Sequence, residues 1–142
     1  MGTIYTARYS YRGPDRVDTT RYHKGADTWG IAFAPPRWLL DVAKGYAGAL
    51  ARLPRGVEPP PDDDAGRWDW YAQHYRAAML AGYGTRSTPG PHRAAWERLL
   101  SMPEATVVCF CGARDGCHRG LLAGYVERLG GGGRASHAAS AF

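Results

Sequence analysis

Two segments near the start of the chain have the residue pattern of β-strands. Residues 4–11 alternate with a period of two, so one face of the predicted strand is rich in tyrosine. After a turn at residues 13–15, residues 16–22 are rich in β-forming residues and predict a second, short strand. Residues 24–36 contain two glycines and end in two prolines, so we expect a loop, with an extended stretch at residues 31–33.

The middle of the chain has apolar residues at helical spacing in three segments. The first predicted helix covers residues 38–53, the second begins at Trp68 and ends at residues 82–84, and the third lies between Pro91 and Pro103. Between the first two helices, residues 55–66 contain three prolines and three aspartates, which predict an exposed loop. Consecutive aspartates in a loop more often face solvent or cap the next helix than bind a metal.

The last third of the chain reads as a strand followed by a helix. Residues 105–111 are apolar almost throughout, which predicts a central strand buried on both faces. After a turn at residues 112–116, a final helix ends at Gly130. The alternation of strands and helices predicts an α/β fold: a single domain over residues 1–130, with a mostly parallel sheet flanked by helices, and a flexible tail at residues 131–142.

Length and composition suggest a cytoplasmic protein. The chain has 142 residues, which suits one domain with an adequate core. No apolar run approaches the roughly 20 residues of a membrane-spanning helix, and the start of the chain lacks a signal-peptide pattern, so we expect no membrane partner. All three cysteines lie between residues 109 and 117, so in a reducing cytoplasm we expect thiols, thiolates or metal ligands.

The charge of the chain is positive and comes almost wholly from arginine. The net charge is +5, with 16 arginines and two lysines among the 18 basic residues. Arginine binds phosphate with two parallel hydrogen bonds and stacks on bases, which suits a nucleotide or nucleic-acid partner. GC-rich coding would explain the abundance of arginine, alanine and glycine equally well, so composition alone assigns no partner.

The strongest candidate site is the junction between the buried strand and the last helix. Cys117, His118 and Arg119 lie in the first turn of that helix, where free amide groups and the helix dipole favour anions. The same environment favours the ionised thiol, so Cys117 is a candidate thiolate. Arg119 suits a bidentate contact to phosphate or carboxylate, and His118 suits proton transfer or orientation of a ligand.

A zinc site is the alternative use of the same segment. Cys109, Cys111, Cys117 and His118 are the ligand types that tetrahedral zinc prefers. Cys109 and Cys111 share one face of the strand, but Cys117 and His118 are adjacent, which differs from the usual spacing of ligand pairs. Cys109 is also typical of a small apolar core residue. We therefore expect no cofactor, with zinc as the alternative.

The sequence VVCFCGARDGCHRGLLA at residues 107–123 resembles the family called domain of unknown function 488. The shared pattern is an apolar strand ending in cysteine, a short acidic turn, and Cys-His-Arg at the start of a helix. Residues 33–35 before a Trp-containing helix are similar to another part of the pattern. The chain departs from the pattern at Cys111, where an acidic residue is expected, and at residues 7–9.

The resemblance implies an α/β fold and a single site made by residues from both ends of the chain. By this resemblance, the site contains Cys109, Cys117, His118 and Arg119, together with Asp18 and Arg21. Because both predicted strands end in charged turns, we expect the side chains of Asp18, Arg21 and Arg119 to converge near Cys117 and form an anion-accepting pocket.

Two functions fit these residues. The first is a small enzyme that acts on a phosphate-bearing ligand, namely a nucleotide, a nucleoside or a base in nucleic acid. Its catalytic candidates are Cys117, His118 and Asp18, and its ligand-binding candidates are Arg119, Arg21 and Arg8. The second is a non-catalytic module that binds nucleic acid through basic and aromatic residues near the start of the chain. Those residues are Arg8, Arg12, Arg16, Arg21, Lys24, Tyr5, Tyr9, Tyr11 and Tyr22.

Overall fold

The computed structural model describes residues 3–8, 12–13, 15–18, 28–109, 118–129 and 134–137. Only the backbone is described at residues 8, 18, 28–30, 109, 118 and 134–137. The elements are β1 Thr3–Arg8, β2 Arg16–Asp18, α1 Thr28–Phe33, α2 Arg37–Ala43, the 3-10 helix η2 Ala49–Arg52, α3 Asp64–Tyr83, α4 Arg93–Ser101, β3 Glu104–Cys109, α5 His118–Leu129 and β4 Arg134–His137. None of the described helices is both long and apolar enough to cross a membrane.

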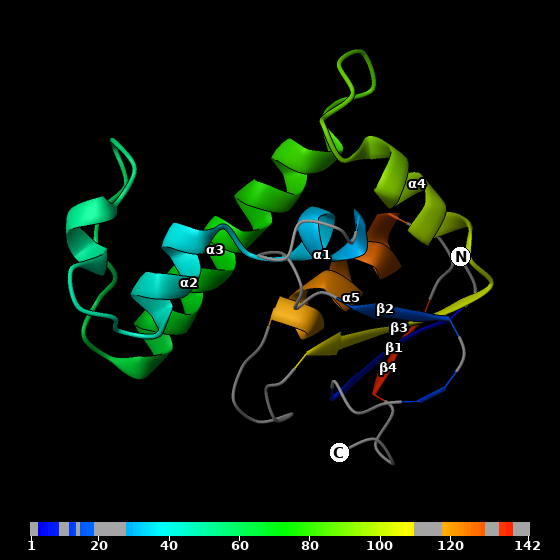
Figure 1. Ribbon diagram of the computed structural model, residues 1–142, viewed down its shortest axis with the longest axis horizontal. Coiled ribbons are helices and arrows are strands. Elements are labelled where there is room, and N and C mark those ends of the chain that lie inside the picture. The colour runs from blue at the N-terminus through cyan, green and yellow to red at the C-terminus, as the bar shows by residue number, and fades with distance from the viewer. Residues whose placement is uncertain are drawn as a thin grey trace. The chain divides into compact units, whose positions relative to one another are not determined.

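The four described strands form one parallel sheet. Their order is β2-β3-β1-β4, and the three pairings β2·β3, β1·β3 and β1·β4 are all parallel. Figure 1 shows the strands side by side, with α5 next to them. The predicted α/β fold, with a mostly parallel sheet flanked by helices, is therefore confirmed.

The buried strand of the sequence analysis is β3, and it lies inside the sheet between β2 and β1. Four successive residues of β3, from 105 to 108, are fully buried. Successive side chains of a strand point to opposite faces, so β3 is covered on both faces, as predicted. The apolar residues Leu122, Ala123 and Val126 of α5 are also buried.

By its internal contacts the chain divides into two compact units. We call Met1–Ala34 together with Ala81–Phe142 the sheet unit, and Pro35–Leu80 the helical unit. The sheet unit holds all four described strands with α1, α4 and α5, while the helical unit holds α2, η2 and most of α3. The predicted domain boundary at residue 130 stays a prediction.

Aromatic side chains form much of the interior of the helical unit. The ring of His74 lies 5.5 Å from Trp38 and 4.7 Å from Trp70, centroid to centroid, with both pairs edge to face. The indole Nε1 of Trp70 donates a hydrogen bond of 2.8 Å to the carbonyl of Glu58. This bond attaches the loop before α3 to the helix itself.

The predicted loop at residues 55–66 is confirmed as far as residue 63. Residues 53–63 have no helix or strand, and most of their side chains are exposed. Asp63 caps α3, because its Oδ2 accepts a hydrogen bond of 2.8 Å from the backbone N–H of Gly66. At least one aspartate of this loop is thus a helix cap, as the sequence pattern favours.

Three details of the predicted elements are wrong. The helix expected over residues 38–53 ends at Ala43 and is followed by the separate 3-10 helix η2. The reason lies in two glycines with left-handed backbone: Gly45, with φ +70°, follows the end of α2, and Gly48, with φ +77°, directly precedes η2.

The second detail is the stretch at residues 31–33, which forms part of helix α1 rather than an extended segment. Tertiary packing explains the difference, since Phe33 is fully buried and its ring meets Trp96 of α4 edge to face at 5.0 Å. The third detail is β4, which lies within the predicted tail and pairs with β1 from Thr3↔Arg134 to Thr6↔His137. This pairing satisfies backbone groups of β1 that would otherwise form an open sheet edge.

Candidate functional site

Three of the predicted site residues lie at one edge of the sheet. Arg8 is the last residue of β1, Asp18 of β2 and Cys109 of β3. The strands are parallel, Arg8 lies across from Cys109, and Asp18 lies across from Val108. Since neighbouring strands are about 4.8 Å apart, the backbones of Arg8 and Asp18 lie roughly 10 Å apart, on either side of the end of β3. We call this edge, defined by these three residues, the carboxyl edge.

Helix α5 is attached to the same edge through Arg119. Arg119 lies in the first turn of α5, and its Nη1 donates a hydrogen bond to the carbonyl oxygen of Ala7, the next-to-last residue of β1. The side chain of Arg119 is buried, with 2% of its surface exposed. The first turn of α5 and the ends of the strands are therefore parts of one local structure.

Burial gives Arg119 a structural role that the sequence analysis did not anticipate. A guanidinium group removed from water needs hydrogen-bond acceptors, and the carbonyl of Ala7 supplies one. The bond joins the last helix to the first strand, two segments 112 residues apart in the sequence. It also puts a permanent positive charge close to the carboxyl end of β1. Direct contact between Arg119 and a ligand stays a prediction.

The remaining site residues are described only in part. Cys111, Cys117 and Arg21 lie outside the described residues. Arg8, Asp18, Cys109 and His118 are placed by their backbones alone. The backbone brings Asp18 and Arg119 to the same edge of the sheet, whereas the convergence of the Asp18, Arg21 and Arg119 side chains stays a prediction.

The alternative of a zinc site also stays a prediction. Within the described side chains, no group of three or more His, Cys, Asp or Glu residues could hold a metal ion. The side chains of the four proposed ligands, Cys109, Cys111, Cys117 and His118, are not among those described.

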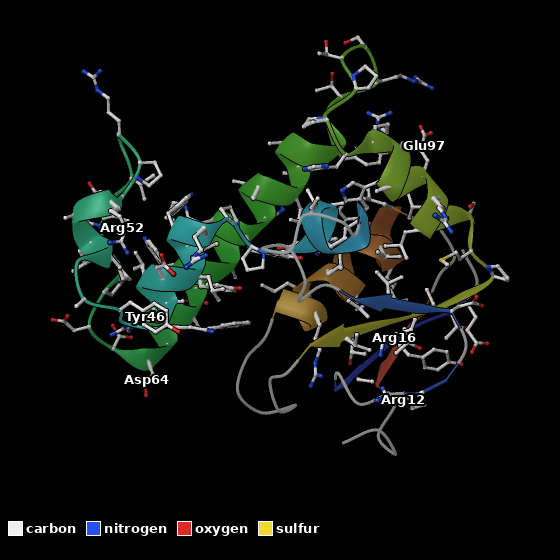
Figure 2. The ribbon with its side chains drawn as sticks, viewed as in Figure 1. Arg12, Arg16, Tyr46, Arg52, Asp64 and Glu97 are labelled. Atoms are coloured by element: carbon white, nitrogen blue, oxygen red, sulfur yellow. The ribbon has the colours of Figure 1, made fainter. Side chains whose placement is uncertain are left out.

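Among the residues proposed to bind nucleic acid in the non-catalytic alternative, the structure describes three side chains. Arg12 is exposed, while Arg16 at the start of β2 and Tyr5 in β1 are half-buried. Figure 2 labels Arg16 in β2 and Arg12, which precedes that strand in the sequence. The partial burial of Tyr5 limits its use as an exposed stacking surface.

A second cluster of charges, which the sequence analysis missed, lies in the helical unit. Asp41 is 7% exposed and accepts hydrogen bonds from Arg37 and Arg52. The spacing of four residues between Arg37 and Asp41 is a sequence signal for an ion pair on a helix. No comparable signal exists for Arg52, because its approach to Asp41 depends on the break after α2.

Comparison with known proteins gives one result. Residues 2–130 match the family model DUF488-N3a, which is described as the active DUF488-N3 subclade. Neither the curated proteins nor the solved structures gave a match. The match covers nearly the whole chain, including β1, β2, β3 and α5, which meet at the carboxyl edge. The chain therefore belongs to the DUF488 family, in its DUF488-N3a group.

Proposed function

We propose that this protein is a small enzyme acting at the carboxyl edge on a phosphate-bearing ligand: a nucleotide, or a nucleoside or base that is part of a nucleotide or nucleic acid. One observation carries the proposal: the strand register and the bond from Arg119 to Ala7 bring Arg8, Asp18 and the first turn of α5 together. In open α/β sheets, ligands bind outside the carboxyl ends of the strands. The description of the matched family group as active agrees with an enzyme.

Electrostatics supports an anionic ligand at this edge. The first turn of α5 offers backbone N–H groups and the positive end of a helix dipole over a 12-residue helix. The buried charge of Arg119 adds to this potential, because a low-dielectric surrounding screens it less than water does. Arg8 and Arg21 are proposed to contact the anion directly, with Asp18 orienting the arginines.

The proposed chemistry uses Cys117 or Asp18 as the reactive group. Cys117 immediately precedes α5, and a cysteine at a helix start is favoured as the thiolate, which is the nucleophilic form. Asp18 ends β2 at the same edge and is the alternative reactive group. His118, the first residue of α5, is proposed to transfer a proton.

The test combines binding with turnover. The purified protein is incubated with a panel of nucleoside mono-, di- and triphosphates, nucleosides and oligonucleotides, and products are detected by mass spectrometry. We expect turnover of at least one member, and its loss in Cys117→Ser or Asp18→Asn with binding retained. Arg128→Gln is the matched control, because Arg128 is exposed in the last turn of the same helix, roughly 13 Å from Arg119 along the axis.

Two outcomes would reject the enzyme. Absence of both binding and turnover across the panel would remove the proposed ligand class. Binding of nucleic acid without turnover would instead favour the non-catalytic module. In that case each contacting arginine should add about −0.7 to −0.9 to the slope of log affinity against log salt. Metal analysis of protein purified without added metal tests the zinc alternative in either case.

A further inference from the structure

The α2–η2 segment, defined here as residues 37–57 of the helical unit, presents only positive charge to solvent. Its basic residues Arg37, Lys44, Arg52 and Arg55 are all exposed. The single acidic residue between positions 37 and 57 is Asp41, which is 7% exposed. The other acidic residues of the helical unit begin at Glu58. Of their charged side chains, residues 37–57 thus expose only basic ones, whereas residues 58–80 contain five acidic residues together with Arg67 and Arg76.

Asp41 holds two of these arginines next to each other. The Nε of Arg37 lies 3.4 Å from Oδ1 of Asp41, and the Nη2 of Arg52 lies 3.4 Å from Oδ2 of the same carboxylate. The arginines come from α2 and from η2, so the carboxylate also joins these two elements. Because both guanidinium groups contact one carboxylate, they lie close enough together to reach a single phosphate group.

The side chains of this pair remain open to a ligand. The relative exposure of the side chain is 70% for Arg37 and 56% for Arg52, against 10% for Asp41. The cluster carries two positive charges and one negative charge, so an arriving anion meets a net positive charge. The arginine fork is planar and already oriented by Asp41, which lowers the ordering cost of binding a phosphate.

An exposed aromatic residue, Tyr46, is joined to the same cluster through its backbone. The backbone N–H of Tyr46 donates to the carbonyl of Asp41 at 3.1 Å, and the Tyr46 side chain is 53% exposed. The Nζ of Lys44 lies 5.9 Å from the centre of the Tyr46 ring. Figure 2 shows Tyr46 and Arg52 in this part of the helical unit. Cations interleaved with an exposed aromatic ring are typical of surfaces that bind single-stranded nucleic acid.

We propose that the α2–η2 segment binds single-stranded nucleic acid, with one backbone phosphate held between Arg37 and Arg52 and a neighbouring base stacked on Tyr46. Charge complementarity selects a phosphate backbone, and the exposed ring selects a strand whose bases are unpaired. The inference does not depend on the enzyme proposed at the carboxyl edge, because every residue that carries it lies in the helical unit.

The test measures the binding of labelled oligothymidylate and oligouridylate by fluorescence anisotropy across a range of salt concentrations. In the double variant Arg37→Gln with Arg52→Gln we expect the affinity to fall about tenfold and the salt slope to become less steep by about 1.4, as for two lost contacts to a single strand. The matched control is Arg67→Gln with Arg76→Gln, which removes two exposed arginines from α3 in the same unit. The control should lose much less affinity.

A second variant guards against misfolding of the first, since the double variant leaves Asp41 without its two partners. Arg37→Gln, Asp41→Asn and Arg52→Gln together remove all three charges and should weaken binding equally. Tyr46→Ala should weaken binding without changing the salt slope, because stacking releases no counterions.

Several results would overturn the proposal. The first is that the unaltered protein does not bind oligonucleotides. The second is that the affinity is unchanged in both Arg37/Arg52 variants, and the third is that the α3 control loses as much affinity as the double variant. Tighter binding of a duplex than of its single strand would contradict the role of Tyr46. Displacement of the oligonucleotide by polyglutamate at equal charge concentration would identify an acidic protein surface as the partner instead.

Discussion

The sheet unit and the helical unit differ in how much charge they carry and where it lies. The sheet unit contains 12 of the 18 basic residues and 7 of the 13 acidic residues, which leaves six of each in the helical unit. The whole net charge of +5 thus belongs to the sheet unit. In that unit Arg119 is buried against β1, whereas Arg37 and Arg52 of the neutral unit are exposed around a buried carboxylate.

This difference shows that the net charge of a unit does not determine which of its charged side chains are exposed to a ligand. A buried guanidinium stabilises the fold through its hydrogen bond and acts on a ligand through its field. An exposed guanidinium adds little to stability, because water screens it and its side chain loses entropy when it is held. We therefore expect substitutions of Arg119 to reduce stability most, and substitutions of Arg37 to reduce it least.

The largest effect is expected for Arg119→Met. The substitution removes a buried charged donor and leaves the carbonyl of Ala7 without this bond, so the free energy of unfolding should fall by about 2 to 3 kcal/mol. Urea denaturation followed by circular dichroism measures the change. Arg128→Met, in the exposed last turn of the same helix, should alter stability by less than about 0.5 kcal/mol. Equal midpoints for Arg119→Met and the unaltered protein would show that the buried bond is unimportant.

An intermediate effect is expected for Asp41→Asn. The carboxylate is mostly buried but its partners are exposed, so losing its charge should reduce the free energy of unfolding by about 1 kcal/mol. Asp69→Asn serves as the control, because Asp69 is exposed on α3 of the same unit. If Asp41→Asn lowers the free energy of unfolding as much as Arg119→Met does, the expected difference between the two units is wrong.

The smallest effect on stability is expected for Arg37→Gln alone. Its side chain is 70% exposed, and Arg52 continues to pair with Asp41, so the free energy of unfolding should change by less than about 0.5 kcal/mol. Affinity for oligothymidylate should nevertheless fall, because one of the two proposed phosphate contacts is lost. A large loss of stability with unchanged affinity would reverse the roles assigned to the two kinds of arginine.

The strongest sequence patterns predicted the sheet and its central strand. The residues of β3 are apolar on both faces of the strand. Both faces of the sheet must therefore be covered by other parts of the protein at this strand. Flanking prolines located α4, since Pro91 and Pro103 exclude a helix beyond them. The expected parallel topology also predicted that Asp18 and the start of α5 lie at one edge of the sheet.

Other features depend on contacts that the sequence does not reveal. The apolar spacing over residues 38–53 predicted one continuous helix, but Gly45 follows the end of α2 and Gly48 precedes η2. Helix α1 owes its form to packing of Phe33 on Trp96, which is distant in the chain. The burial of Arg119 depends on an acceptor 112 residues away, and the contact between Arg52 and Asp41 depends on the turn that the glycines create.

The proposed enzyme requires that a phosphate-bearing ligand bind at the carboxyl edge. Titration of isotope-labelled protein with nucleoside monophosphates, followed through backbone amide resonances, tests whether this edge is the binding site. We predict that the largest shifts occur at the ends of β1, β2 and β3, at Arg8, Asp18 and Cys109, and in the first turn of α5. Detectable binding that saturates while these amides remain unchanged would contradict the claim.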